Sequence, residues 1–558
     1  MDLLKILQSK KGKDFMTKHS KFFFKTMIGG VDEFLESVHN PRKFQERCLL
    51  NLIEENKNTD FGREHHFDKI KTVEDFQKNV PIMDYEDLRP YIEKVIYGNT
   101  KALFSQKPLM FLKTSGTTDK PKYIPVTKQS KQENKTNFQI WIYYTVIDHP
   151  NLVGGTTLNI SSPTKEGRIG KYPFSSYSGW IRDNQPILNK LFYAIPEAIY
   201  EIEDENLRYY SLIRCSIEQN ITMINTANSS TVLNLARKAD EKKEILIKDV
   251  RDGKISSDSI IETDKRILKK LHFKPNPDKA RELEEIVNET GRLLPKDYWE
   301  NLVVIGCWKG GSQSIFYSQF NEYYGQVPVR DLGILASEGR MTIPIRDKGS
   351  SGVLDISHTF FEFIPDNEIE KQNPQVLRAD ELEKNEIYFI LMTTSGGLYR
   401  YNIGDRVKVT GFYENAPELC FLDKGKHCSS LTGEKLTEYQ TVLAMRNLNT
   451  GIDEFVLHPA MDNEASIPYY KLLIEETKLE DLDVDKFQLH YDKELRKINP
   501  EYDSKRKTRL DSIRIKSIPD GTFRRFKSGS LSKRGIKTDI QYKHQFLNPT
   551  LNFDGELE

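Results

Sequence analysis

Hydrophobic positions recur at helical spacing through roughly the first hundred residues, between charged positions that face solvent. Phe44, Cys48 and Leu49 illustrate this spacing, which predicts surface helices. Residues 80–82 (Val-Pro-Ile) break the pattern and predict a short extended stretch. A new helix is expected to begin at Asp84.

A strand, a polar turn, a second strand and a helix are predicted between residues 110 and 145. Met110–Lys113 is a short apolar run, residues 114–122 are polar, and Tyr123–Val126 is apolar again. Thr127 is placed to cap the following helix. The apolar face of that helix is formed by Phe138, Trp141, Ile142 and Thr145.

Short buried strands then alternate with charged helices. Residues 157–160, 221–224 and 302–305 read as strands, and residues 232–250 and 278–288 read as helices. The first of these helices is expected to stop near Gly253. This alternation favours an α/β architecture with a largely parallel sheet.

The pattern changes between residues 350 and 425, where short strands follow one another with glycine-rich turns. Strands are expected at residues 386–391, 399–403, 406–410 and 419–422. They predict an antiparallel, barrel-like subdomain. We expect residues 1–424 to form a large domain, 425–434 a polar hinge, and 435–558 a small α+β domain.

Composition narrows the class of protein. The chain has 558 residues, more than one hydrophobic core usually organises, and its 82 basic and 82 acidic residues cancel. This balance argues against a nucleic-acid partner. The sequence contains no run of about 18 apolar residues, so no membrane span is predicted, and no signal peptide is recognised. The five cysteines are scattered and odd in number, which favours a reducing cytoplasm over disulfides or a zinc site.

The polar turn at residues 114–122 is the first candidate site. Small hydroxyl residues and a glycine expose backbone N–H and O–H donors, and a lysine adds positive charge, which suits phosphate oxygens. The residues concerned are Ser115, Gly116, Thr117, Thr118 and Lys122. No Walker A spacing occurs in the chain, and an ordinary surface loop is the alternative.

Two acidic residues are further candidates. Asp405 follows Gly404 at the end of a predicted strand, where its carboxylate can accept hydrogen bonds from a ribose diol. The alternative is an ordinary turn residue. Glu338 follows Ser337 in a predicted loop and can hold Mg²⁺, or the pair can simply cap a helix.

Taken in order, these segments resemble the motifs of a known family. They are similar to those of the acyl-acid amido synthetases of the Gretchen Hagen auxin-responsive family, in its bacterial form. That family is part of the adenylate-forming superfamily, with firefly luciferase. The resemblance covers nearly the whole chain, and residues 397–405 are its most specific element. The matching segments are residues 59–63, 80–85, 114–125, 336–339, 397–405, 433–438, 521–523 and 541–543.

The resemblance implies a luciferase-like fold, with αβ subdomains and a β-barrel-like subdomain in the large domain and a mobile small domain. It implies a ligase that uses ATP and Mg²⁺ to activate a carboxylic acid as acyl-AMP, releasing pyrophosphate. The acyl group then passes to an amine, most simply that of an amino acid. No motif specifies the acid, the amine or the oligomeric state.

The resemblance also assigns roles to residues. Those implied to bind ATP or AMP are Ser115, Gly116, Thr117, Thr118, Lys122, Gly311, Ser312, Ser337, Glu338, Tyr399 and Asp405, with Glu338 also holding Mg²⁺. Lys435 and Lys543 are implied to approach the α-phosphate as catalytic residues. The chain departs from the family pattern at Asp119, where many members have glycine, and after Lys543, where proline and arginine are missing.

Two alternatives remain open at this stage. One is a ligase that forms thioesters with coenzyme A, and the other is an inactive, nucleotide-binding relative. For the acyl acid we expect a pocket in the large domain near residues 172–180 and Trp308, although aromatic residues there can equally belong to the core.

Overall fold

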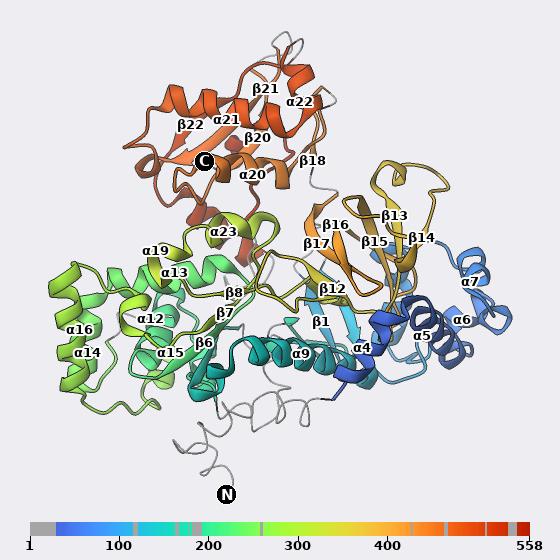
Figure 1. Ribbon diagram of the computed structural model, residues 1–558, viewed down its shortest axis with the longest axis horizontal. Coiled ribbons are helices and arrows are strands. Elements are labelled where there is room, and N and C mark those ends of the chain that lie inside the picture. Colours follow the sequence, from blue (N-terminus) through green and yellow to red (C-terminus); the bar gives the residue numbers. More distant parts are fainter. Residues whose placement is uncertain are drawn as a thin grey trace, which may run out of the picture. The chain divides into compact units, whose positions relative to one another are not determined.

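The computed structural model describes residues 29–557, except 115–120, 162–166, 178, 181–191, 257–260, 426–427, 433, 463–466, 508–509 and 534–543 (Figure 1). The chain forms two compact units. The first comprises residues up to 309 together with 320–403 and 408–420, and the second comprises 310–319, 404–407 and 421–558. The domain boundaries expected at residues 424 and 434 stay predictions.

The first unit begins with helices, as the hydrophobic spacing predicts. They are α4 (Val31–His39), α5 (Pro41–Asn56), α6 (Asp60–Glu64), α7 (Val73–Asn79) and α8 (Tyr85–Ile96). Asp84 caps α8 by accepting hydrogen bonds from the amides of Glu86 and Asp87, at 2.7 and 3.3 Å, so the predicted start is confirmed. Val80 has an extended backbone, as expected from the proline that follows it.

The predicted strand, turn, strand and helix are also present. Strands β1 (Met110–Thr114) and β2 (Lys122–Val126) pair antiparallel. The sheet order is β2-β1-β5-β4, with β4 at Gly167–Ile169 and β5 at Tyr172–Ser175. Thr127 caps α9 (Lys128–Asp148) by accepting a 3.1 Å hydrogen bond from the Ser130 amide, which confirms the expected cap.

A four-stranded parallel sheet follows, in the order β3-β6-β7-β8. Its strands are β3 (Thr156–Asn159), β6 (Ile221–Asn225), β7 (Val304–Gly306) and β8 (Val329–Arg330). The α/β prediction is therefore confirmed here. The described helices of the first unit between β3 and β8 in the sequence (Figure 1) are α12 (Glu205–Ser216), α13 (Ser229–Glu241), α14 (Lys243–Asp252), α15 (Glu262–Leu268), α16 (Pro277–Thr290), α17 (Pro295–Tyr298) and α19 (Phe320–Tyr324).

The single helix predicted for residues 232–250 is wrong in one respect, because it is two helices. Lys242 leaves helical geometry, with φ −105° and ψ 15°, and separates α13 from α14. Gly253 ends α14 in the left-handed region, as expected. The charged sequence hides the break, since lysine itself is a good helix former.

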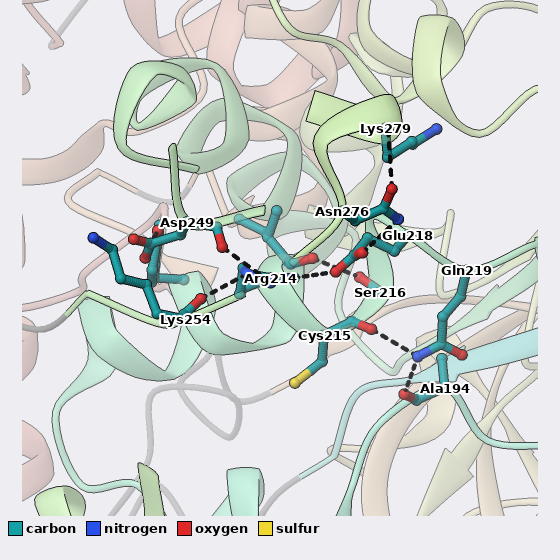
Figure 2. Close-up of polar contacts among 12 residues, drawn as sticks. Ala194, Arg214, Cys215, Ser216, Glu218, Gln219, Asp249, Lys254, Asn276 and Lys279 are labelled. Atoms are coloured by element: carbon teal, nitrogen blue, oxygen red, sulfur yellow. Dashed lines mark hydrogen bonds and ion pairs between the residues drawn. The ribbon is translucent and has the colours of Figure 1, made fainter. Parts of the chain in front are cut away.

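Buried polar contacts of Arg214, which lies in α12, hold this helix together with the ends of α14 and α16 (Figure 2). Its guanidinium forms an ion pair with Glu218 and donates to the carbonyl oxygens of Lys254 and Asp249, at 2.9 and 3.2 Å. Glu218 in turn accepts a 2.8 Å hydrogen bond from the side chain of Asn276, which caps α16. The cluster therefore satisfies a fully buried cation and fixes helix positions.

A seven-stranded sheet has the order β11-β12-β17-β16-β15-β13-β14. Its strands are β11 (Thr342–Ile343), β12 (Gly352–Leu354), β13 (Phe360–Pro365), β14 (Leu377–Arg378), β15 (Ile387–Thr393), β16 (Tyr401–Tyr413) and β17 (Ala416–Lys424). The strands predicted at residues 399–403 and 406–410 are one strand, β16. Gly404 adopts φ 80°, which glycine accommodates without strain, so the turn-like sequence does not end the strand.

The second unit contains a three-stranded sheet with helices. Its sheet order is β20-β21-β22, formed by Val456–Ala460, Tyr469–Glu475 and Arg514–Ile518. Its helices are α18 (Ser314–Tyr317), α20 (Glu438–Leu448), α21 (Val484–Ile498), α22 (Pro500–Arg506) and α23 (Thr522–Lys533), and β18 (Cys428–Ser429) pairs with β19 (Leu436–Thr437). A core cluster includes Val456, Leu473 and Phe523. The predicted α+β character of the C-terminal part is present.

Two further predictions concern membranes and cysteines. Within the described ranges, no helix combines the length and the apolar character needed to cross a bilayer. All five cysteines are described and none is in a disulfide, as their scattered positions predict. Cys428 is exposed, whereas burial raises the thiol pKa of Cys215 and Cys307 to about 12.

Candidate functional site

The hairpin of β1 and β2 brings together the two ends of the predicted phosphate loop. Thr114 pairs with Lys122 in the antiparallel register, so the loop leaves and re-enters the sheet at one point. Ser115, Gly116, Thr117 and Thr118 lie outside the described residues, and their phosphate role stays a prediction. The base of the loop is nevertheless well defined, because its flanking strands are paired.

Lys122 stands at this base, held between two tyrosines. Its Nζ lies 3.5 Å from the hydroxyl oxygen of Tyr401 and 5.4 Å from the ring centre of Tyr85. The Tyr85 hydroxyl accepts a 2.7 Å hydrogen bond from the Tyr123 amide and donates to the Tyr123 carbonyl at 3.2 Å. Burial raises the pKa of Tyr85 to about 12, so this phenol stays protonated and donates.

Ser337 and Glu338 form the tip of a two-residue hairpin. Strands β9 (Leu335–Ala336) and β10 (Gly339–Arg340) pair antiparallel on either side of them. The helix-cap alternative is therefore excluded, because a hairpin turn and not a helix starts here. The Tyr401 hydroxyl donates to Oε1 of Glu338 at 3.3 Å. Tyr401 thus joins a cation, Lys122, and a carboxylate, Glu338, and sequence reasoning did not single it out.

Arg400, within the most specific motif, is buried and serves the fold. Its guanidinium forms two hydrogen bonds with the carboxylate of Glu362, at 2.9 and 3.0 Å, and donates to the carbonyls of Gln77 and Val80. Backbone hydrogen bonds also join Met83 to Arg400 and Asn402, at 3.1 and 2.8 Å. The segments 80–85 and 397–405, which are far apart in the sequence, therefore pair with each other in the fold.

Tyr399 is fully buried against the matching segment at residues 59–63. Its ring stacks on Phe61, with 4.6 Å between ring centres, and its hydroxyl donates to the Leu103 carbonyl at 3.0 Å. In this structure the side chain packs the segment 59–63 onto the sheet. Its implied contact with the nucleotide stays a prediction.

A cavity of the first unit adjoins these motifs. Its lining includes Ser337, Glu338, Gly396 and, from the segment where an acyl pocket is expected, Trp180. Trp308 is not part of the lining, and its indole N–H donates to the Gly333 carbonyl at 2.8 Å. Of the two places where the acyl pocket was expected, residues 172–180 contribute to the cavity lining through Trp180, and Trp308 does not.

The second unit holds the remaining predicted residues. Asp405 is 5% exposed and forms an ion pair with Lys424 through Oδ1. Gly311 and Ser312 lie in a short 3-10 helix (Gly311–Gln313), where Gly311 has φ 55° and a Cβ would come within 3.1 Å of the Phe421 ring. A side chain at position 311 would therefore meet both a strained backbone and a close neighbour.

Lys435 is exposed, and its backbone is left-handed with φ 44°. The preceding turn is built around the buried carboxylate of Glu434, which accepts from the amides of Leu431 and Thr432, at 2.6 and 2.8 Å, and from the Tyr470 hydroxyl at 2.5 Å. This network sets where the Lys435 side chain begins. Lys543 lies outside the described residues, so both catalytic roles stay predictions.

Comparison with known proteins identifies related domains along the chain. The GH3 family N-terminal domain matches residues 30–329, the GH3 family central domain matches residues 352–424, and the GH3 family C-terminal domain matches residues 437–551. Together these matches cover well over half of the sequence.

Individual proteins are similar over most of their length. A jasmonoyl–L-amino acid synthetase of Nicotiana attenuata is 25% identical over 440 residues, which is 74% of each chain. The solved structure of the GH3.15 acyl acid amido synthetase superposes with a TM-score of 0.80 at 20% identity, over 94% of this chain and 95% of that one. A 2-hydroxyisobutyryl-CoA ligase in the postadenylation state gives a TM-score of 0.52 at 11% identity, covering 88% and 94%. These structural likenesses show that the chain shares the fold of these two enzymes.

Proposed function

The chain belongs to the GH3 family and is a ligase, an acyl-acid amido synthetase, and we propose that it uses ATP with Mg²⁺ to join a small carboxylic acid to an amino acid. In the first half-reaction a carboxylate oxygen attacks the α-phosphorus of ATP and pyrophosphate leaves. In the second, the amine attacks the acyl carbon, AMP leaves, and the amine loses a proton.

One observation supports the proposal above all others. Lys122 and Glu338, from two separate motifs, are joined through the Tyr401 hydroxyl at the base of the loop 115–121. A cation at this point would neutralise phosphate charge, and a carboxylate would hold a metal ion that supplies further positive charge. Loop donors, a cation and a carboxylate are the groups that nucleotide activation needs in one place.

The residues present fit a magnesium ion bound mainly by its substrate. Mg²⁺ usually takes one or two protein carboxylates and fills its other positions with phosphate oxygens and water. Glu338 supplies such a carboxylate at a hairpin tip facing the cavity. Among the described residues, no cluster of three acidic, histidine or cysteine side chains could hold a metal ion without other ligands. Bound Mg²⁺ would neutralise charge on the departing pyrophosphate.

Asp405 would hold the ribose through its carboxylate. An ionised carboxylate offers about four acceptor positions, and the ion pair with Lys424 uses Oδ1. Lys435 and Lys543 would stabilise negative charge at the α-phosphate, each in one half-reaction. Exclusion of water from the active site would protect the mixed anhydride from hydrolysis until the amine arrives.

The proposal is tested by ATP–pyrophosphate exchange with purified protein, Mg²⁺ and a panel of carboxylic acids. We expect exchange with at least one acid, and AMP as the nucleotide product once an amino acid is added. Formation of ADP would contradict the proposal. Mass spectrometry of the product with amino acids and, separately, with coenzyme A distinguishes an amide from a thioester. Absence of exchange with every acid, despite ATP binding, would indicate an inactive relative.

A further inference from the structure

The cavity beside Glu338 has a lining that is unusually polar for a pocket that holds a carbon skeleton. Apolar groups come from Leu112, Val126 and Trp180, but Glu133 and Asn137 of α9 also face it. If Glu338 marks the place of nucleotide activation, as the proposed function holds, the acid must put its carboxylate there. The rest of the acid then occupies the cavity, in contact with α9.

Asn137 presents an acceptor that has no partner in the described part of the chain. Its side chain is 3% exposed, and its Nδ2 donates to the carboxylate of Asp355 at 2.6 Å. The amide cannot be turned over, since its oxygen would then face that carboxylate. Its Oδ1 is buried and has no hydrogen-bond partner among the described residues. A buried acceptor of this kind is costly to leave unpaired, so a ligand donor is the natural partner.

Thr394 presents a second buried polar atom, a hydroxyl oxygen, that has no hydrogen-bond partner among the described residues. It lies in the cavity lining, is 6% exposed, and its Oγ1 has no partner in the described part of the chain. By contrast, the neighbouring Ser395 hydroxyl donates to Glu133 at 2.5 Å. The Thr394 hydroxyl can therefore donate to a ligand or accept from it.

The charges around the cavity favour a neutral ligand group. The carboxylate of Asp355 lies 3.4 Å from Nδ1 of His358. Burial alone would lower the pKa of His358, but the charges of Asp355 and Glu133 raise it to about 9, so this pair is a matched cation and anion. Burial also raises the pKa of Glu133 to about 7, which shows that an additional negative charge is disfavoured there.

A hydroxyl group meets all of these conditions. It can both donate, as Asn137 Oδ1 requires, and accept, as the Thr394 hydroxyl allows, whereas an ammonium group only donates and a carboxylate only accepts. We propose that the cavity holds the acyl part of the substrate, and that Asn137 and Thr394 select a carboxylic acid carrying a hydroxyl group on that part. This inference rests on the proposed function and adds the substrate class to it.

The test compares pairs of acids that differ by one hydroxyl group, in the ATP–pyrophosphate exchange assay. Suitable pairs are lactate and propionate, hydroxybutyrate and butyrate, and hydroxybenzoate and benzoate. For at least one pair we expect the wild-type protein to prefer the hydroxylated acid in kcat/KM by at least about tenfold, because a site built for a hydroxyl leaves polar groups unpaired without it.

Thr394→Val removes the hydroxyl while keeping the shape of the side chain. We expect it to reduce the preference for the hydroxylated acid by about 3- to 10-fold, the contribution of one neutral hydrogen bond. Thr394→Ser should retain the preference. The matched control is Thr226→Val, because the Thr226 hydroxyl is also buried without a partner in the described chain but lies outside the cavity lining.

The outcomes separate the two proposals. If exchange occurs but every pair reacts equally, or the deoxy acid is preferred, the selection of a hydroxyl group is refuted while the ligase activity stands. The same conclusion follows if Thr394→Val and Thr226→Val leave the preference equally unchanged. If no acid supports exchange, the proposed function fails, and the inference fails with it. The wild-type comparison decides the matter even if a variant does not fold.

Discussion

The buried pair of Arg400 and Glu362 offers a strong test of how the first unit is held together. Arg400→Met removes the cation and leaves Glu362, which is 1% exposed, as a buried carboxylate. Among the described residues, the side-chain donor that remains to it is the Gln77 amide, at 2.9 Å. Breaking a buried pair by removing one partner costs about 3–5 kcal/mol. We expect the loss of stability to be centred on the segment near Gln77 and Val80, because Arg400 also donates hydrogen bonds to the carbonyls of these two residues.

Hydrogen exchange at two backbone amides measures this cost directly. The Met83 amide donates to the Arg400 carbonyl, and the Asn402 amide donates to the Met83 carbonyl. At about 1.4 kcal/mol for each power of ten, their protection should fall by about two to nearly four powers of ten in the variant. The double variant with Glu362→Leu should regain much of the loss, because no unpaired charge remains buried.

A matched control is available on the surface. Arg63 pairs with Asp60 at 2.6 Å, but its side chain is 62% exposed. Arg63→Met should therefore change stability by about 1 kcal/mol or less. Protection of Met83 and Asn402 that is equal in the Arg400 and Arg63 variants would refute the structural role assigned to Arg400.

Three further predictions concern nucleotide, metal and proton binding. Asp405→Asn should weaken ATP binding about tenfold or more in calorimetry with the fold intact, because a charge-assisted hydrogen bond to ribose is lost; unchanged affinity would remove this assignment. Glu338→Gln should raise the Mg²⁺ concentration needed for half-maximal AMP formation about tenfold, whereas an unchanged Mg²⁺ titration would place the metal elsewhere. Burial raises the pKa of Glu133 from 4.5 to about 7 in the folded protein, so wild-type stability should fall as pH rises between these values. Glu133→Gln lacks this loss, and its free energy of unfolding relative to wild type should increase by about 2–3 kcal/mol between pH 4 and pH 8; a constant difference would show that folding does not raise the pKa of Glu133.

The sequence predicted those elements whose signals are local. The Asp84 and Thr127 caps depend on residues two or three positions away, and both are found as expected. The parallel strands at residues 221–225 and 304–306 follow from short apolar runs between charged helices. Local chemistry decides such features, so one chain is enough to recognise them.

Features that depend on tertiary contacts were not predictable in the same way. The sequence marks Gly404 as a turn residue, but strand pairing carries β16 through it. Arg400 has no assigned role in the sequence, and its function in the fold becomes evident only from its buried partner Glu362. Tyr401 and Asn137 are ordinary residues in the sequence, and their importance comes from Lys122, Glu338 and Asp355 beside them.

The uneven exposure of the cysteines gives a practical means of labelling this protein. Burial raises the thiol pKa of Cys48, Cys215, Cys307 and Cys420, which slows their reaction with alkylating reagents, whereas Cys428 is exposed in β18. A maleimide dye should therefore attach at Cys428 without any cysteine being mutated. Such a dye would sit seven positions before Lys435 in the sequence, where its fluorescence can report what happens near that lysine as ATP, acid and amine are added in turn.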